Sequence, residues 1–171
     1  MPAFILRPLK KSDIKSIAYH ANNKLVWKNL RDQFPFPYFE RDAENFIKLF
    51  EGKSPVTVFA IDVNGEAIGA AAIVLKDDVY RLNGEIGYWL GQEYWGKGIA
   101  TLAVAELTRI AFDELNLLRV YAEVFGPNLA SARVLEKNGF VKEAVLKKAI
   151  IKDNDIHDTV IFSKLNQNFK F

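Results

Sequence analysis

A glycine-rich turn at residues 94–101 is the first place in this sequence where residue type and spacing suggest chemistry. It reads Tyr-Trp-Gly-Lys-Gly-Ile-Ala-Thr, with Gly96 and Gly98 on either side of Lys97, and it separates an apolar segment from an amphipathic one. Glycines let backbone N–H groups approach a ligand closely. The start of a helix adds unpaired N–H donors and the positive end of the helix dipole. The turn therefore predicts a site for a phosphate group.

Two common phosphate-binding patterns fit this turn only in part. The pattern G-x-x-x-x-G-K-[S/T] is matched by Gly91, Gly96 and Lys97, but Gly98 stands where a hydroxyl should reach Mg²⁺. The dinucleotide pattern G-x-G-x-x-G begins at Gly96 and Gly98 but meets Thr101 in place of its third glycine, and no βαβ half follows it. A P-loop-like nucleotide binder stays open as an alternative.

A second segment, residues 128–140, combines a helix start, a hydroxyl group and a helix stop. Asn128 is a favoured N-cap residue, Ser131 follows three positions later, and Gly139 is placed to end the helix. Because residues three apart on a helix share a face, Asn128 and Ser131 could contact one ligand. The same residues also make a well-capped helix that binds nothing, so both readings stay open here.

Together these two segments resemble the GNAT superfamily of N-acetyltransferases, in its RimJ/RimL-like branch. The family signature is [Q/R]-x-x-G-x-[G/A]. The sequence is similar to it at Gly98 and Ala100, and Trp95 replaces the Gln or Arg, as is usual in the branch, where Tyr-Trp-Gly-Lys-Gly recurs. Residues 128–140 resemble the branch's N-x-x-S…L-E-K-x-G-F segment almost residue for residue.

The resemblance implies transfer of an acetyl group from acetyl-coenzyme A to a primary amine, by direct attack in a ternary complex. Backbone N–H groups of residues 96–100 would hold the pyrophosphate of coenzyme A, and main-chain groups of residues 88–90 would pair with its pantetheine arm, which Asn128 would also contact. The expected coenzyme A-binding residues are Tyr88, Trp89, Leu90, Trp95, Gly96, Lys97, Gly98, Ile99, Ala100, Asn128 and Ser131. The resemblance covers residues 4 to about 165 and is specific in 85–101 and 128–140.

Glu85 and Ser131 are the catalytic residues that we expect from this resemblance. An ammonium must lose a proton before it can attack a thioester, and Glu85 is the candidate general base, acting through water. Its charge would also attract a cationic acceptor; a solvated carboxylate at a strand end is the alternative. By the same resemblance, Ser131 would assist departure of the thiolate as donor or proton relay. Many relatives have a tyrosine one helical turn further on, where Leu135 stands here, so Tyr88 or water is an alternative proton donor. A backbone N–H would stabilise the oxyanion, and Gly87 fits a bulge or close approach beside the site.

The acceptor is not identified by the sequence. Members of the superfamily acetylate protein N-termini, in particular those of ribosomal proteins, and also polyamines, amino-acid derivatives and aminoglycosides. Trp27, Phe34 and Phe36 would wall the acceptor pocket or anchor a loop on the core. His157 is expected as an exposed strand residue or at the border of the acceptor site, and His20 on the solvent side of the first helix.

Composition limits the function without identifying it. The 171 residues are 50% hydrophobic and 26% charged, which predicts one globular domain over residues 1–171. The absence of cysteine excludes disulfides and an acyl-cysteine intermediate, and two histidines are too few for a His-rich metal site, so no metal is expected. A net charge of +2 gives no case for a nucleic-acid partner.

Location and assembly follow from the same reasoning. The longest apolar run, residues 67–75, is far shorter than the ~20 residues of a membrane helix. The N-terminal residues also lack the pattern of a signal peptide. We therefore expect a soluble, cytoplasmic protein without a membrane partner. A homodimer stays open, as does a non-catalytic coenzyme A-binding regulator with the same fold.

Strand and helix signals indicate an α/β (α+β) fold. Asn64-Gly65 predicts a hairpin. The next turn could lie at residues 77–78 or at 83–84. Ser12 is the expected N-cap of the first helix. The expected strands are 4–6, 56–63, 67–75, 85–90, 119–125, 140–151 and 156–165, and the expected helices are 13–22, 40–50, 96 or 98 to about 115, and 128–139, with a proline-broken loop over 23–39. The resemblance implies a GNAT-like, mixed and mostly antiparallel sheet of about seven strands flanked by helices, with two central parallel strands that splay apart.

Overall fold

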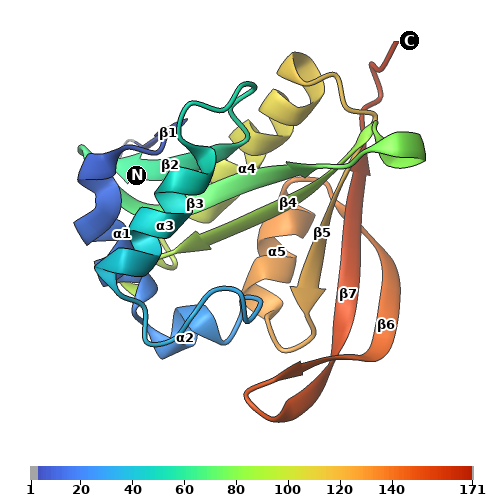
Figure 1. Ribbon diagram of the computed structural model, residues 1–171. Coiled ribbons are helices and arrows are strands. Elements are labelled where there is room, and N and C mark those ends of the chain that lie inside the picture. The colour runs from blue at the N-terminus through green and yellow to red at the C-terminus, as the bar shows by residue number, and fades with distance from the viewer. Residues whose placement is uncertain (1–3, 171) are drawn as a thin grey trace. The chain divides into compact units, whose positions relative to one another are not determined.

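The computed structural model describes residues 4–170 and contains a seven-stranded mixed sheet with the strand order β1-β2-β3-β4-β5-β7-β6 (Figure 1). The strands are β1 (Phe4–Pro8), β2 (Val58–Val63), β3 (Glu66–Leu75), β4 (Asn83–Leu90), β5 (Arg119–Phe125), β6 (Val141–Lys152) and β7 (Asp155–Leu165). The helices are α1 (Ile14–Ala21), α2 (Lys24–Trp27), α3 (Glu40–Phe50), α4 (Ile99–Arg109) and α5 (Leu129–Lys137). The predicted fold class is confirmed.

The chain forms two compact units, which are described separately. The first contains the described residues up to 71 and residues 88–103, and the second contains residues 72–87 and the described chain from 104 onward. Strand β4 therefore begins in the second unit and ends in the first. The expectation of a single domain over residues 1–171 stays a prediction.

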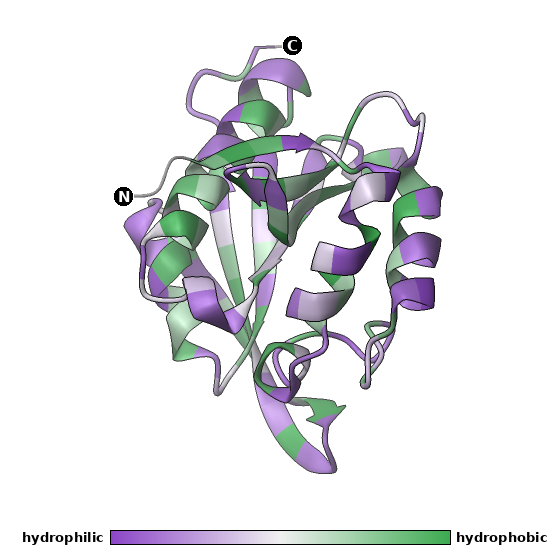
Figure 2. Ribbon diagram, turned by 90° about the vertical axis from the view of Figure 1, so that its left-hand side faces the viewer, coloured by the Kyte–Doolittle hydropathy of each residue, from purple (hydrophilic) through white to green (hydrophobic). Residues whose placement is uncertain are grey.

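The first unit contains β1, β2, helices α1, α2 and α3, and parts of β3, β4 and α4. Strand β1 pairs antiparallel with β2, and helices α1 and α3 contact each other. Asn64 and Gly65 join β2 to β3 with φ angles of 54° and 88°, as a tight hairpin turn requires, which confirms the predicted hairpin. Figure 2 shows hydrophobic and hydrophilic bands alternating along the helices, as expected where one face packs on a core.

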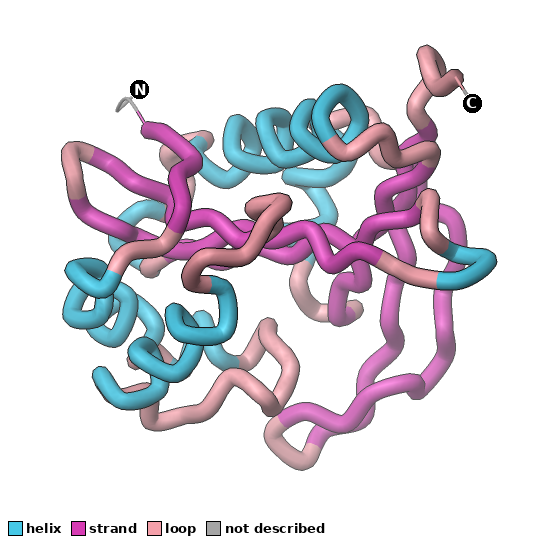
Figure 3. Tube along the Cα trace, turned by 45° about the horizontal axis from the view of Figure 1, so that its top comes forward, coloured by secondary structure: helices cyan, strands magenta, loops and turns pink. Residues whose placement is uncertain are grey.

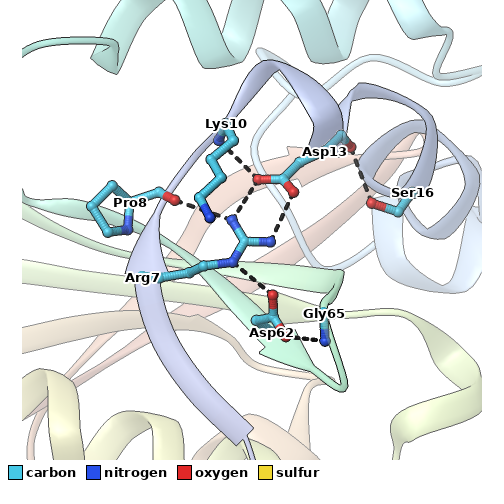
Figure 4. Close-up of polar contacts among 7 residues, drawn as sticks. All are labelled: Arg7, Pro8, Lys10, Asp13, Ser16, Asp62 and Gly65. Atoms are coloured by element: carbon cyan, nitrogen blue, oxygen red, sulfur yellow. Dashed lines mark hydrogen bonds and ion pairs between the residues drawn. The ribbon is translucent and has the colours of Figure 1, made fainter.

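A buried ion network fixes the entry to α1 (Figure 4). The Arg7 guanidinium donates two hydrogen bonds of 2.8 Å to the Asp13 carboxylate and one of 2.6 Å to Asp62. The Lys10 N–H also donates to Asp13, over 2.8 Å, at the start of a short 3₁₀ turn, Lys11–Asp13. The prediction that Ser12 caps this helix is wrong, because Asp13 binds both the backbone and Arg7 there.

Asp13→Asn is expected to lower the free energy of unfolding by about 3 kcal/mol at pH 7, because it leaves a buried cation with one partner fewer. Burial alone would raise the pKa of Asp13, but the hydrogen bonds from Arg7 and Lys10 outweigh it and lower this pKa below its ordinary value. A lowered folded-state pKa stabilises the fold above about pH 4, the unfolded value, and this contribution is lost as pH falls through the folded value.

Urea unfolding of the wild type and Asp13→Asn at pH 7 and near pH 3 measures this effect. The difference in the free energy of unfolding between the two proteins should be smaller at the acidic pH. An equal difference at both pH values would contradict a stabilising role for the ionised Asp13 carboxylate. Asp113→Asn, at an exposed position, is the matched control and should leave stability within about 0.5 kcal/mol.

The second unit contains the central parallel pair and a long hairpin. Asn83–Glu85 of β4 pair in parallel with Arg119–Tyr121 of β5, and β5 continues to Phe125, where it still pairs with β7. The parallel pairing thus involves the first three residues of each strand, as expected for two strands that separate beyond their start. Figure 3 shows β6 and β7 as two long strands joined by a short turn.

The turn that the sequence left open lies before residue 83. A 3₁₀ turn, Asp78–Tyr80, connects β3 to β4, and the Lys76 N–H donates to the Asn83 carbonyl over 3.2 Å. Asn83 and Gly84 belong to β4 itself. This connection fixes Lys76 beside the start of β4, which matters for the site.

The amphipathic segment predicted after the glycine-rich turn is confirmed as a helix with one buried face. Ile99, Ala103, Leu107, Ile110 and Ala111 are all buried, whereas Arg109 and Asp113 are exposed. Helix α4 continues as a π turn, Ile110–Glu114, so the expected end near residue 115 is also confirmed.

Candidate active site

The glycine-rich turn has the backbone that its sequence predicts. Gly96 and Gly98 have φ angles of 73° and 79°, in the left-handed region that side chains rarely adopt, and residues 95–98 are exposed. A Cβ atom at Gly96 would meet nothing within 4 Å. Helix α4 begins at Ile99, so its unpaired N–H groups follow the turn directly. The turn therefore suits the pyrophosphate of coenzyme A.

Trp95 holds this turn to the strand before it. Its Nε1–H donates to the Leu90 carbonyl over 2.9 Å, across the 3₁₀ turn Gln92–Tyr94. This contact explains what a tryptophan does at the position where the family signature has Gln or Arg. The Leu90 carbonyl is thus already used inside the chain, and pairing of residues 88–90 with pantetheine stays a prediction.

Side chains of α1 and of Asn23, just after it, contact the same 3₁₀ turn. Tyr19 Oη donates to Glu93 over 2.9 Å, and Asn23 Nδ2 donates to Gln92 Oε1 over 2.8 Å. The His20 ring lies edge-on to Tyr94, with 5.5 Å between ring centroids. Residues 92–94 of the 3₁₀ turn are therefore each contacted by a side chain from residues 19–23.

The prediction that His20 faces solvent is wrong. It is 4% exposed, and its Nε2 lies 2.9 Å from Glu66 Oε1. A Cβ atom at Gly91 would lie 2.4 Å from His20 Nδ1, so only glycine fits at the start of the turn. His20 is thus a buried packing residue against Gly91 and Tyr94, in the segment that leads to the glycine-rich turn.

Glu85 occupies a half-buried position on the parallel part of β4. Lys76 Nζ donates to its Oε2 over 2.9 Å, with the Lys76 and Glu85 side chains 28% and 13% exposed. Tyr121, on β5, is its register partner. The sequence indicates Glu85 but not Lys76, because no local spacing links a residue just after β3 to one nine positions later on β4.

Gly87 leaves open space on the strand that carries Glu85. The two residues are two positions apart and therefore point to the same face of β4. A Cβ atom at Gly87 would meet nothing within 4 Å, so no other atom of the protein fills the space on this side of β4. A bulge, or the close approach of a ligand at Gly87, stays a prediction.

Asn128 and Ser131 form the start of α5 as the sequence predicts. Asn128 Oδ1 accepts a hydrogen bond of 3.1 Å from the Ser131 N–H, which confirms the N-cap. This bond uses the carbonyl oxygen of the Asn128 amide. Leu135, one turn after Ser131, is fully buried and belongs to the core.

The aromatic residues of the loop at 23–39 and His157 are only partly explained by the structure. Phe34 packs against the core and lies edge-on to Trp89, with 5.5 Å between centroids, so it anchors the loop. Trp27 pairs with the exposed Phe36 at 5.8 Å. His157 is partly exposed on β7 opposite Ile150. A role of any of these residues at an acceptor site stays a prediction.

Comparison with known proteins tests the predicted family directly. Residues 3–141 match the family described as "Acetyltransferase (GNAT) domain". The chain belongs to the GNAT acetyltransferase family. The resemblance drawn from the two motifs is therefore confirmed, and so, at the level of the family, is the prediction of an N-acetyltransferase that uses acetyl-coenzyme A.

Individual relatives agree with this GNAT assignment. The chain is 35% identical over 107 residues to the N-acetyltransferase YdaF of Bacillus subtilis (strain 168), which covers 63% of this chain and 58% of that protein. It is 28% identical over 141 residues to spermidine N(1)-acetyltransferase of Escherichia coli (strain K12), covering 82% and 74% of the two chains. The solved structure of ribosomal-protein-S5-alanine acetyltransferase from Vibrio fischeri aligns with a TM-score of 0.84 and 26% identity, covering 100% and 97%.

The described part of this GNAT chain offers neither a metal cluster nor a membrane-spanning helix. Residues 4–170 contain no group of three or more His, Asp or Glu side chains that could hold a metal ion. No helix in the same range is long and apolar enough to span a membrane. The first eight residues, from which the lack of a signal peptide was inferred, begin with three that lie outside the described range.

Proposed function

We propose that this chain transfers the acetyl group of acetyl-coenzyme A to a primary amine by direct attack in a ternary complex. The observation that carries the proposal is the exposed turn at Gly96 and Gly98, with left-handed backbone directly before α4, in a chain that belongs to the GNAT family. Backbone N–H groups of residues 96–100 bind the pyrophosphate. Lys97 adds a cation close to it, beside the Tyr94 ring.

Glu85 is the proposed general base. It accepts, through water, the proton that the acceptor ammonium must lose before its nitrogen lone pair can bond to the thioester carbonyl carbon. The carbon–sulfur bond then breaks and its electron pair leaves on sulfur. The open space at Gly87, on the same face of β4 as Glu85, supports this role because a substrate can approach the carboxylate there.

Ser131 is the proposed proton relay for the departing sulfur, and Asn128 the proposed pantetheine contact. The N-cap bond orients Asn128 with its Nδ2 donor available for a ligand carbonyl, and it starts α5 so that Ser131 lies on the same helix face. Leu135 is buried and has no proton to give. Tyr88 or water stays the alternative donor.

Ser131→Ala is expected to lower kcat by about 10- to 100-fold, the equivalent of one charge-assisted hydrogen bond of about 1.5–3 kcal/mol to the developing thiolate. The cap should survive, because the bond to Asn128 comes from the backbone N–H of residue 131. Steady-state release of free thiol measures the effect. A kcat within twofold of the wild type, with an unchanged KM for acetyl-coenzyme A, would remove Ser131 from the mechanism.

The acceptor is proposed to be a primary amine on a protein N-terminus or a small molecule. Similarity to a ribosomal-protein-alanine acetyltransferase and to a spermidine acetyltransferase supports these two classes. The proposal includes a cytoplasmic location, with no nucleic-acid or membrane partner. A homodimer stays open and is tested by light scattering at several protein concentrations.

Calorimetry and thiol release separate this proposal from the two alternatives. The chain should bind acetyl-coenzyme A and not ATP–Mg²⁺; the opposite result would favour a P-loop-like nucleotide binder. With acetyl-coenzyme A present, a panel of N-terminal peptides and amines should include at least one that stimulates thiol release. Binding without stimulated release by any amine would favour a coenzyme A-binding regulator.

A further inference from the structure

The ion pair between Lys76 and Glu85 at the start of β4 is fixed by a backbone hydrogen bond as well as by charge. Lys76 directly follows β3, and its own N–H donates to the Asn83 carbonyl, so its backbone is fixed two residues from Glu85. From there its Nζ reaches Glu85 Oε2 at 2.9 Å. Both side chains are mostly shielded from solvent, so this pair has lost much of the water that weakens exposed ion pairs.

An aromatic ring and further charges surround this pair. Lys76 Nζ lies 5.6 Å from the centroid of the Tyr121 ring, and the Arg119 guanidinium lies 4.8 Å from the same centroid. Arg119 also donates to Asn83 Oδ1 over 3.2 Å and pairs with Glu143. Lys76 is thus paired with Glu85 and Arg119 with Glu143, and both cations lie against the Tyr121 ring.

Lys76 keeps its charge in this environment. Burial lowers the pKa of its ammonium, but hydrogen bonds to Glu85 and Tyr121 outweigh burial and raise this pKa above its ordinary value. The ammonium therefore stays protonated at neutral and moderately alkaline pH. It stays in position to orient a carboxylate throughout that range.

We propose that Lys76 is a positioning residue, which holds the Glu85 carboxylate in the orientation from which it accepts the proton of the acceptor amine. Lys76 contacts neither the acetyl group nor the amine in this mechanism and acts through Glu85. The inference rests on the proposed function, because it assigns Lys76 a task only if Glu85 is the base. It goes further by adding a residue that no sequence motif indicates.

Loss of Lys76 should affect the chemical step and leave coenzyme A binding intact. Proton transfer depends steeply on geometry, and a carboxylate freed from its partner can adopt other rotamers. Lys76→Met is therefore expected to lower kcat about tenfold and to leave the KM for acetyl-coenzyme A within twofold. Lys76→Arg, which keeps a cation that can pair with a carboxylate, should recover kcat to within about threefold of the wild type.

A double-mutant cycle tests whether Lys76 works through Glu85. The four proteins are the wild type, Lys76→Met, Glu85→Gln and the double variant, each assayed by thiol release with one amine acceptor. Lys76→Met should lower kcat about tenfold in the wild-type background but less than twofold in the Glu85→Gln background. The two effects should be non-additive because Lys76 acts through Glu85. Lys147→Met, which breaks an exposed pair with Asp158, is the matched control and should leave kcat unchanged.

The possible results distinguish this inference from the proposed function. If Glu85→Gln lowers kcat but Lys76→Met has the same effect in both backgrounds, the inference is wrong and the role of Glu85 stands. If Glu85→Gln leaves kcat unchanged, the base assignment fails and the inference fails with it. Should Lys76→Met fail to fold, Lys76→Gln replaces it in the same cycle, with the same expected non-additivity.

Discussion

Glu85→Gln is expected to lower kcat by a factor of about 10² to 10⁴, the range that general acid–base catalysis contributes. Glutamine keeps the size of the side chain and can still contact Lys76, but it cannot accept a proton from the attacking amine. The fold should be affected little, because the residue is replaced by its isostere. Initial rates of thiol release at saturating acetyl-coenzyme A and amine measure the effect, together with the thermal midpoint.

Two controls make this result specific. Glu136→Gln removes an exposed carboxylate on α5 and should leave kcat unchanged. Acetyl-coenzyme A should bind Glu85→Gln with nearly the wild-type Kd, because the proposed pyrophosphate turn is elsewhere in the sequence. A Glu85→Gln protein with wild-type kcat would mean that Glu85 is an ordinary strand-end carboxylate and that another group accepts the proton.

Gly96→Val is expected to weaken binding of acetyl-coenzyme A about 100-fold. A β-branched residue is strained at a φ of 73°, and its side chain would fill the open space in which we place the phosphates. Loss of one or two charge-assisted hydrogen bonds of about 1.5–3 kcal/mol each gives a change of this size. Calorimetric titration with acetyl-coenzyme A measures it.

The chain provides a closely matched control for backbone strain. Gly52, after α3, has a φ of 70°, and a Cβ atom there would also meet nothing within 4 Å. Gly52→Val should therefore lose stability as Gly96→Val does, by roughly 1–2 kcal/mol, but keep the wild-type Kd for acetyl-coenzyme A. Equal affinity of both variants for the ligand would contradict the role of the turn.

Most of the fold and both motifs were predictable because their signals are local. The left-handed backbone at Asn64-Gly65, the Asn128 cap and the glycine turn each follow from residues adjacent in sequence. The amphipathic face of α4 follows from spacing alone. These are cases in which the local preference of the chain and the folded structure agree.

The errors arose where distant residues decide the outcome. Ser12 has the right side chain for a cap, but Asp13 takes the position because Arg7, from β1, binds it. His20 lies at the edge of the buried face of α1, and Gly91 covers it from a segment about seventy residues away. Helix periodicity does not contain that information.

Lys76 shows the same limit at the site itself. Sequence reasoning reached Glu85 through the family motif and the need for a base. Its partner became visible only when β3 and β4 were placed side by side, since the turn between them could not be assigned from sequence. At Gly87 the structure adds that no other atom of the protein fills the space beside the strand, which the sequence does not show.

Direct acetyl transfer is tested most directly by initial-rate kinetics with both substrates varied, followed by mass spectrometry of peptide and protein. We predict intersecting double-reciprocal lines, one acetyl group added to the N-terminal amine of an active peptide, and no acetylated form of the protein on the reaction path. Parallel lines together with a protein acetylated before the amine is added would contradict direct attack in a ternary complex.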